Sequence, residues 1–383
     1  MEAFELFTVK ANGIRHRVAS VKGCPPTRSA GLRPVSLVML LHGWPESWYS
    51  WRHQLLALAS AGYPVVAPDM RGFGGTDAPA HVRDYTVDRL CLDVLGIAES
   101  LGYSHITVIG HDFGSYLAWH LALLHPKRVV AVCGMSVPYL GHSPRQESLL
   151  ARLQRQFGTC LPESPYCASR NEQDNAKFHY ILHHNLPHVA EEYDRNCEEV
   201  LYRLYSFKPG VDCEPPDLTE KSMFPQGSRD VNAESGGLLD ARSAPGFWAR
   251  LPRPRALASF LTPDDFQYIV QQYRETGFAG GLKWYQALDA NWFRTRDLKG
   301  KKVEQPSLFL VGAEDRDVLS NNGGLDNIIR GMRQSCSKLT KCIILPDTGH
   351  WLQQERYVEI NSALLKFLEE VSSPIGNFQA SKL

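Results

Sequence analysis

The chain has 383 residues, enough for one large α/β domain with an insertion or for two ordinary domains. Its 41 basic and 41 acidic side chains give a formal net charge of zero, which argues against a polyanionic partner such as nucleic acid or an anionic membrane surface. The hydrophobic fraction is 43%, and no apolar run approaches the roughly 18 residues of a membrane span. We therefore expect a soluble protein with a full core.

The first residues and the cysteines bear on the compartment in which the protein works. The opening stretch MEAFELFTVKANG has neither a basic flank nor an apolar centre, so we expect no secretory signal there. Nine cysteines lie between Cys24 and Cys342, and no two form a CxxC pair, which disfavours a disulfide framework and a zinc site. Reduced thiols in an intracellular compartment fit this pattern best.

Residues 4–19 alternate apolar and polar side chains around Asn12-Gly13, which predicts a β-hairpin. Short apolar runs then recur along the chain, and such runs are typical of strands buried on both faces. They occupy residues 36–41, 64–68, 106–110, 129–136, 307–312 and 342–346. Because segments of helical periodicity separate these runs, we predict an α/β fold with a mostly parallel sheet and helices on both faces.

The alternation of strands and helices stops near Tyr139 and resumes near Gln305, which indicates an inserted helical cap. We divide the chain into a first core part (1–138), the cap (139–300) and a second core part (301–383). Helical periodicity marks 177–184, 198–207 and 263–278, the last with an N-cap at Thr262 and a proline at Pro263. Residues 208–255 are rich in Pro, Gly, Ser and charge and predict a long irregular loop.

Four polar residues or motifs follow predicted strands, where the carboxyl ends of parallel strands gather functional groups. They are His42-Gly43-Trp44-Pro45, Asp112, Asp315 and His350. A nucleophile, an acid and a histidine in this chain order are typical of a hydrolase whose nucleophile stands on a sharp strand-to-helix turn. Gly110 and Gly114, on either side of Asp112, are the residues that such a turn requires.

Each of these residues also has a structural interpretation. An aspartate after a strand is often a helix N-cap, and the flanking glycines are what favour a nucleophile here. Asp317, two residues after Asp315, is a second candidate for the acid. His183, His184 and His188 could suggest a metal site, but no carboxylate or cysteine accompanies them at ligand spacing, so we expect no metal and no cofactor.

The aspartate at the turn favours a particular chemistry. A serine there needs a base to activate it, whereas a carboxylate is already anionic at neutral pH. Asp112 can attack an electrophilic carbon to give an alkyl ester, and His350, oriented by Asp315, then activates a water that hydrolyses this ester. The backbone N–H groups of Phe113 and Trp44 are expected to stabilise the oxyanion of this second step.

Several stretches together resemble the soluble epoxide hydrolases of the α/β-hydrolase superfamily, from about residue 4 to residue 370. They are HGWPESWYSW, APDMRGFGGTD, GHDFGSYLAW, SVPY, FHYILHHNLP, GLKWYQALDANW and DTGHWLQQERYVEIN. The resemblance implies the α/β-hydrolase fold with a cap, and it implies that Tyr180 and Tyr285 of the cap donate hydrogen bonds to the epoxide oxygen. After Tyr180, however, the Phe-Gln-x-Pro-Gly of the family is replaced by His184-Asn185-Leu186-Pro187-His188.

The resemblance also implies a pocket for a small-molecule epoxide and a cis peptide bond at Pro45. Four further residues are expected to line this pocket: His42, Pro45, Trp284 and Trp351.

Two other functions compete with epoxide hydrolysis. A haloalkane dehalogenase also uses an aspartate on the turn, but commonly has a tryptophan after it as a halide donor, where this chain has Phe113. A catalytically silent ligand-binding relative usually lacks a reacting residue, whereas every position of the scheme is filled here.

The last tripeptide, Ser381-Lys382-Leu383, matches the signal read by the peroxisomal import receptor when it is free at the carboxyl terminus. We therefore expect the protein in the peroxisome, the cytoplasm or both. The same targeting signal favours fatty-acid epoxides as the substrates.

Overall fold

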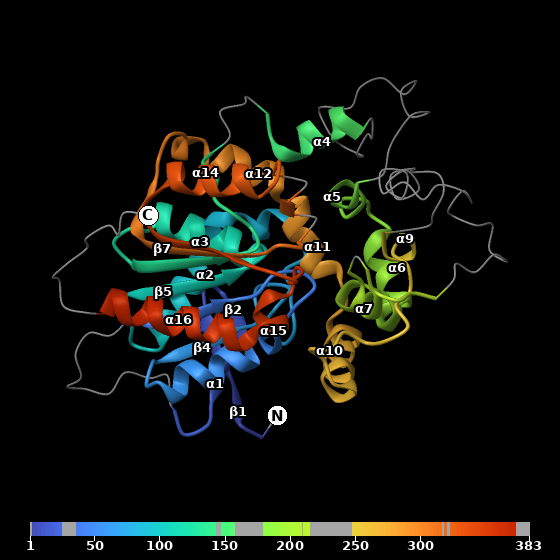
Figure 1. Ribbon diagram of the computed structural model, residues 1–383, viewed down its shortest axis with the longest axis horizontal. Coiled ribbons are helices and arrows are strands. Elements are labelled where there is room, and N and C mark those ends of the chain that lie inside the picture. The colour runs from blue at the N-terminus through green and yellow to red at the C-terminus, as the bar shows by residue number, and fades with distance from the viewer. Residues whose placement is uncertain are drawn as a thin grey trace. The chain divides into compact units, whose positions relative to one another are not determined.

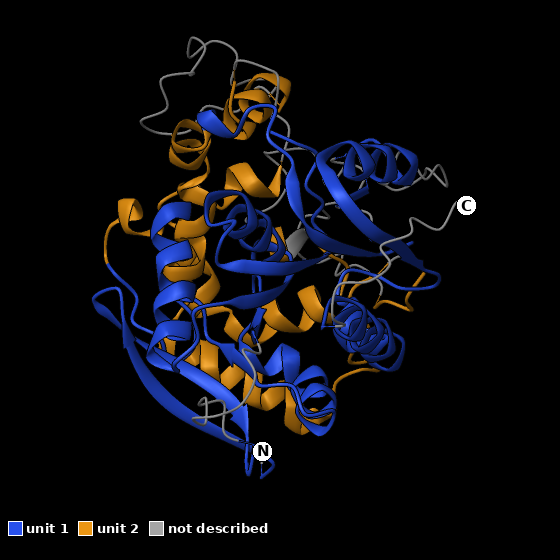
Figure 2. Ribbon diagram, turned by 90° about the vertical axis from the view of Figure 1, so that its left-hand side faces the viewer, with its two compact units in different colours: residues 1–79, 87–143, 296–383 blue, residues 80–86, 144–295 orange. Residues whose placement is uncertain are grey.

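The computed structural model describes residues 2–24, 36–142, 147–157, 179–208, 210–214, 247–315, 318–319 and 322–372. The chain forms two compact units (Figure 2). Unit 1 comprises residues 1–79, 87–143 and 296–383, and unit 2 comprises residues 80–86 and 144–295. Three predicted features lie wholly or mostly outside the described residues: Asp317, the carboxyl-terminal tripeptide and most of the irregular stretch 208–255.

Unit 1 is built on an eight-stranded sheet of order β1-β2-β4-β3-β5-β6-β7-β8 (Figure 1). Its strands are β1 (Phe4–Ala11), β2 (Ile14–Val21), β3 (Leu37–Leu41), β4 (Val65–Pro68), β5 (Ile106–His111), β6 (Val129–Met135), β7 (Val303–Gly312) and β8 (Cys336–Leu345). Neighbouring strands pair in parallel along the sheet order β4-β3-β5-β6-β7-β8. Strand β2 pairs antiparallel with β1 and β4. The predicted mostly parallel sheet is therefore confirmed.

The predicted hairpin is also confirmed. Ala11 pairs with Ile14 across a two-residue turn at Asn12-Gly13, and both turn residues have positive φ, of 48° and 81°. This backbone is the one that Asn-Gly adopts at lowest steric cost in a tight turn between antiparallel strands.

Helices cover both faces of the sheet, as predicted. α1 (Arg52–Ser60) and α16 (Tyr357–Ser372) pack against each other on one face, and α2 (Val87–Ser100) and α3 (Phe113–Leu124) lie on the other (Figure 1). α14 (Leu325–Ser335) packs against β8, and α15 (Leu352–Glu355) precedes α16. The described residues of this unit also form the 3₁₀ helices η1 (Trp48–Trp51) and η4 (Arg296–Leu298). The central strands β3, β4 and β5 are buried along their whole length, which explains their continuous apolar runs.

Unit 2 is helical in its described residues. It contains η2 (Val82–Tyr85), α4 (Leu149–Phe157), α5 (Tyr180–His183), α6 (Val189–Arg195), α7 (Cys197–Ser206), α9 (Phe247–Arg250), α10 (Pro263–Thr276), α11 (Ala279–Gln286) and α12 (Leu288–Arg294). The expected start of α10 is present: Thr262 and Asp265 form a reciprocal capping box, and Pro263 is the first helical residue. The short helix α9 lies inside the stretch predicted to be irregular.

β7 and β8 begin earlier in the chain than predicted. β8 is an edge strand, and exposed polar residues such as Lys338 and Lys341 interrupt its apolar pattern. Charged side chains are typical of a sheet edge, because they oppose pairing with another chain. The apolar-run criterion therefore found only the last residues of this strand.

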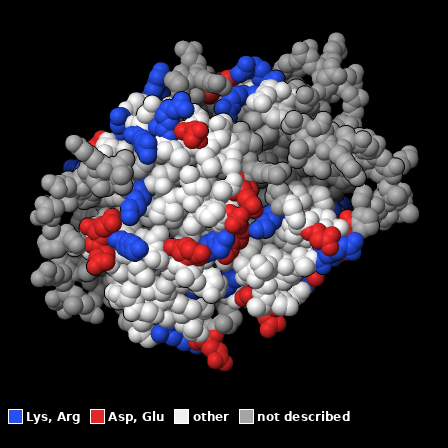
Figure 3. Space-filling view, in the orientation of Figure 1, with Lys and Arg blue, Asp and Glu red and all other residues white. Residues whose placement is uncertain are grey.

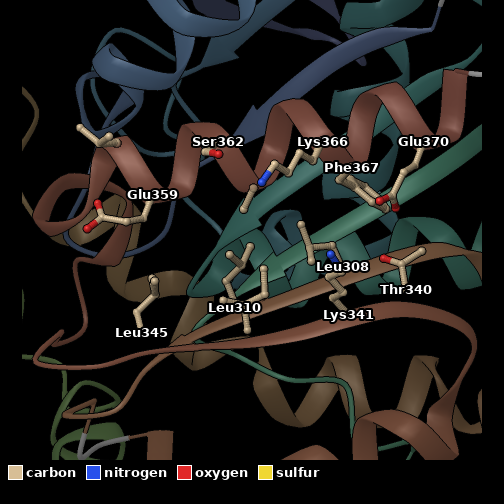
Figure 4. A pocket seen from close by; sticks show the side chains of 13 residues that line it. Leu308, Leu310, Thr340, Lys341, Leu345, Glu359, Ser362, Lys366, Phe367 and Glu370 are labelled. Atoms are coloured by element: carbon tan, nitrogen blue, oxygen red, sulfur yellow. The ribbon is translucent and has the colours of Figure 1, made fainter. Parts of the chain in front are cut away.

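An open groove of about 420 Å³ lies between α16 and the strands β7 and β8 (Figure 4). Leu308, Leu310 and Phe367 line it, with Lys341 and Lys366 among its polar residues. None of the predicted catalytic or pocket residues lines this groove.

Acidic and basic side chains lie next to one another on the face drawn in Figure 3. No helix in the described part of the chain combines the length and the apolar character needed to cross a membrane.

The turn between β5 and α3 fixes the position of the predicted nucleophile. Asp112 has φ 52° and ψ −120°, a strained backbone conformation for a residue other than glycine. A methyl group on Gly110 would overlap the backbone of Gly114, and one on Gly114 would overlap the carbonyl of Leu41 on β3. The two glycines therefore let the turn pack directly against the neighbouring backbone.

Replacing Gly114 with alanine should destabilise unit 1, because Leu41 is held by its pairing with Gly110 and cannot move away. We expect Gly114→Ala to lower the free energy of unfolding, measured in urea, by about 3 kcal/mol or more. The control is Gly331→Ala in α14, where the added methyl meets Cδ2 of Leu140, the end of a side chain that can move away. Equal losses in the two variants would contradict this explanation of the turn.

Candidate active site

Two predicted backbone donors hold the carboxyl group of Asp112 in unit 1. The N–H of Trp44 donates to Asp112 Oδ1 at 2.9 Å, and the N–H of Phe113 donates to the same carboxyl group. One donor comes from the loop after β3 and the other from the first residue of α3. These are the two groups predicted to form an oxyanion hole, and both point at the carboxyl oxygens on which the charge would develop.

The structure brings His350 and Asp315 together beside Asp112. His350 Nδ1 lies 3.0 Å from Asp315 Oδ2, and His350 Nε2 lies 3.8 Å from Asp112 Oδ2. The first distance is a hydrogen bond, in which Nδ1–H donates to the carboxylate; the second is too long for one. The ring therefore carries its proton on the Asp315 side and turns Nε2 toward Asp112.

The two carboxyl groups lie in environments that move their pKa values in opposite directions. Burial raises the pKa of Asp112, although two neighbouring histidines and the two backbone N–H groups oppose the rise. Burial alone would also raise the pKa of Asp315, but the charge of His350 and hydrogen bonds from His350 and Ser136 hold it below its usual value. Asp315 is thus the weaker base and stays ionised, whereas Asp112 is the more basic and more reactive carboxylate.

A buried pair formed by Glu46 and His111 supports this arrangement, and the sequence prediction missed it. His111 Nδ1 lies 2.7 Å from Glu46 Oε2, and His111 Nε2 lies 2.8 Å from the backbone carbonyl of His350. Both partners accept hydrogen bonds, so both ring nitrogens must carry hydrogen and the ring is an imidazolium. The charge of this ring and its hydrogen bond lower the pKa of Glu46 to about 2, against the effect of burial.

Glu46 has two further partners that connect separate loops. Its Oε2 also accepts the N–H of Gly43 at 2.7 Å, and its Oε1 accepts a hydrogen bond from the Gln353 amide at 2.7 Å. A signal for these residues was present in the sequence, because Glu46 directly follows the His-Gly-Trp-Pro motif and His111 directly precedes Asp112.

The three unit 1 residues predicted for the substrate pocket differ in their surroundings. His42 is buried; its Nδ1 lies 2.9 Å from the Gly43 carbonyl, and its Nε2 accepts the N–H of Met70 at 2.9 Å. These contacts give His42 a structural task in the loop, and substrate contact by His42 stays a prediction. Pro45 follows a cis peptide bond, and the ring of Trp351 packs edge-to-face on His350 at 4.8 Å.

Unit 2 brings its two predicted tyrosines together. The rings of Tyr180 and Tyr285 meet edge-to-face with centroids 6.3 Å apart, although 105 positions separate them in the sequence. Tyr180 begins α5, and Tyr285 lies in α11 beside the buried Trp284. The ring of His184 contacts both tyrosines.

The described side chains include no group of three or more His, Cys, Asp or Glu residues that could hold a metal ion.

Comparison with known proteins extends this description. Residues 36–163 match a family model described as the α/β hydrolase fold. The chain is 33% identical to epoxide hydrolase A of Mycobacterium tuberculosis over 94% of its own length and 96% of the relative. It is 32% identical to epoxide hydrolase 2 of Siraitia grosvenorii over 97% of its own length and 100% of the relative.

Solved structures agree with this result. The crystal structure of epoxide hydrolase A from Mycobacterium thermoresistibile superimposes with a TM-score of 0.76 at 34% identity and covers 96% of this chain and 98% of that one. Since these relatives match over nearly their whole length, the chain belongs to the epoxide hydrolases of the α/β-hydrolase superfamily.

Proposed function

We propose that the protein hydrolyses epoxides to vicinal diols through a hydroxyalkyl ester on Asp112. The observation that carries this proposal is the setting of the Asp112 carboxyl group, which has backbone donors on one side and His350 Nε2 at 3.8 Å on the other. A serine nucleophile would need a hydrogen bond to the histidine in order to lose its proton, whereas a carboxylate does not. The histidine is thereby left to act on water.

In the first step, Asp112 attacks one carbon of the epoxide ring. Because Trp44 N–H holds Oδ1, Oδ2 is the oxygen that attacks, and the carbon–oxygen bond of the ring breaks. Burial makes the carboxylate more basic, which strengthens it as a nucleophile. The ring oxygen leaves as a developing alkoxide, and it needs hydrogen-bond donors.

We assign that task to Tyr180 and Tyr285, and we propose unit 2 as the cap that carries them. The adjacency of their rings supports this assignment, because two phenol groups this close can donate to a single oxygen. Trp284, next to Tyr285, is proposed as part of the pocket wall. A dehalogenase would need a donor suited to halide, and Phe113 offers no N–H from its side chain.

In the second step, water hydrolyses the ester. His350 Nε2 takes a proton from the water, which attacks the carboxyl carbon of Asp112, and the Trp44 and Phe113 N–H groups stabilise the oxyanion on Oδ1. The imidazolium that forms is stabilised by ionised Asp315. The bond between the carboxyl carbon and Oδ2 then breaks, and Oδ2 takes the proton back from His350 to become a hydroxyl of the diol. Asp112 loses the remaining proton of the water and returns to its carboxylate as the diol leaves.

His350→Gln should open one epoxide per molecule and then stop, because the ester forms without the histidine and its hydrolysis requires it. Intact-protein mass spectrometry with a styrene-type epoxide should show a stable adduct equal to the substrate mass. His105→Gln, at an exposed position, serves as the control and should turn over normally. A variant that gains no adduct while the wild type forms diol would contradict the two-step scheme.

Tyr180→Phe and Tyr285→Phe should each slow ester formation about 100-fold, since each loses one donor to the leaving oxygen. Rapid quench under single-turnover conditions measures this rate. Tyr202→Phe is the matched control, because the Tyr202 hydroxyl donates instead to the Pro254 carbonyl at 3.0 Å. If ester formation stays at the wild-type rate in both variants, the assignment of the tyrosines is wrong.

We further propose that Ser381-Lys382-Leu383, where it ends the protein, directs it to the peroxisome, with a second pool in the cytoplasm. Fatty-acid epoxides, whose removal is a detoxification, are then the proposed substrates. A fluorescent protein fused to the amino terminus should enter peroxisomes, and deletion of Leu383 should leave the fusion in the cytoplasm. Import that survives the deletion would show that another signal acts.

A further inference from the structure

His184 lies at the centre of a cluster of aromatic rings in unit 2. Its side chain is buried, and its ring centroid is 4.5 Å from that of Tyr285 and 5.6 Å from that of Tyr180, edge-to-face in both cases. The two tyrosine rings are themselves 6.3 Å apart. His184 is therefore in ring contact with both proposed oxygen donors at once, and Phe247 packs on the imidazole at 5.7 Å.

Two hydrogen bonds fix His184 in this position. Its Nε2 lies 3.0 Å from the hydroxyl of buried Tyr193 in α6, and its backbone N–H donates to the Tyr180 carbonyl at 2.8 Å. The first bond restricts rotation of the imidazole, and the second joins the residue to the turn that carries Tyr180. An aromatic ring held at its tip in this way fixes the orientation of the rings packed on its faces and edges.

The imidazole stays neutral in this cluster. Burial lowers its pKa well below the usual value for histidine, and the nearby His183 and His179 lower it further. Burial also raises the pKa of Tyr193 well above its usual value, as does the charge of Glu192. A neutral imidazole bonded to a neutral phenol is thus the state present throughout the physiological range.

The hydrogen bond to Tyr193 distinguishes His184 from an aromatic residue of similar size that could only pack. Phenylalanine fills a similar area but cannot bond to the Tyr193 hydroxyl. His184 therefore contributes a hydrogen bond to Tyr193 in addition to its packing against the neighbouring rings.

We propose that His184 is a positioning residue for epoxide opening: its imidazole, anchored to Tyr193, sets the spacing and orientation of Tyr180 and Tyr285. This inference rests on the proposed function. Because the two tyrosines act only when the ring opens, loss of the anchor should slow ester formation and leave ester hydrolysis, which His350 carries out, unchanged. A purely structural role would not separate the two steps.

The test measures both steps in a double-mutant cycle of His184→Phe, Tyr193→Phe and the double variant. Rapid quench and intact-protein mass spectrometry give the rates at which the ester forms and decays in a single turnover. We expect each single variant to form the ester about tenfold more slowly, and the double variant to be no slower than either, because all three lack the same hydrogen bond. Ester decay should keep the wild-type rate.

The matched control is Tyr202→Phe, which removes a phenol hydroxyl elsewhere in unit 2; that hydroxyl donates to the Pro254 carbonyl at 3.0 Å. This control should form the ester at the wild-type rate. Tyr193→Phe changes a single hydroxyl, so it carries the test if His184→Phe does not fold. Unchanged ester formation in Tyr193→Phe, or equal slowing of formation and decay, overturns the proposal. A wild type that forms no ester with any epoxide instead overturns the proposed function itself.

Discussion

The buried ion pair between Glu46 and His111 is the interaction on which the geometry of unit 1 depends. Glu46 holds the loop after β3 through Gly43 N–H, and His111 holds the carbonyl of His350. The amide of Gln353 completes the connection. The loop that supplies Trp44, the turn that carries Asp112 and the loop that carries His350 thus share one charged centre. Removing either partner would leave a buried charge without its counterion, which is among the costliest changes a protein core can undergo.

The charge of His111 also acts on the carboxyl group of Asp112, together with the charge of His350. The positive charges of His350 and His111 counteract the effect of burial, which by itself would favour the neutral form of Asp112. The proposed nucleophile is thus largely withdrawn from water, while two neighbouring rings and two backbone N–H groups favour its ionised form. Asp315 is stabilised by the charge of His350 too, and in addition by hydrogen bonds from His350 and Ser136. Two aspartates of one fold are in this way given different tasks by their neighbours.

Much of the fold and of the site could be predicted from the sequence, because the signals were local. The central strands are buried on both faces and are continuous apolar runs, and the two glycines around Asp112 identify the turn. The edge strand β8 was found only at its end, since its exposed residues are polar. Glu46 and His111 were missed because their role depends on partners far away in the chain, and neither residue type at those positions is by itself a sign of catalysis.

The long separations within the unit 1 site have a consequence for how the protein folds. Glu46 and Gln353 are 307 positions apart, and His111 and the carbonyl of His350 are 239 apart. Contacts between residues so far apart in the sequence form late, because the entropy of closing a long loop opposes them until the rest of the unit has condensed. During synthesis, the nucleophile leaves the ribosome long before the residues that make its ester hydrolysable. The segment that carries His350 thus decides when a partly folded molecule becomes able to hydrolyse the proposed ester.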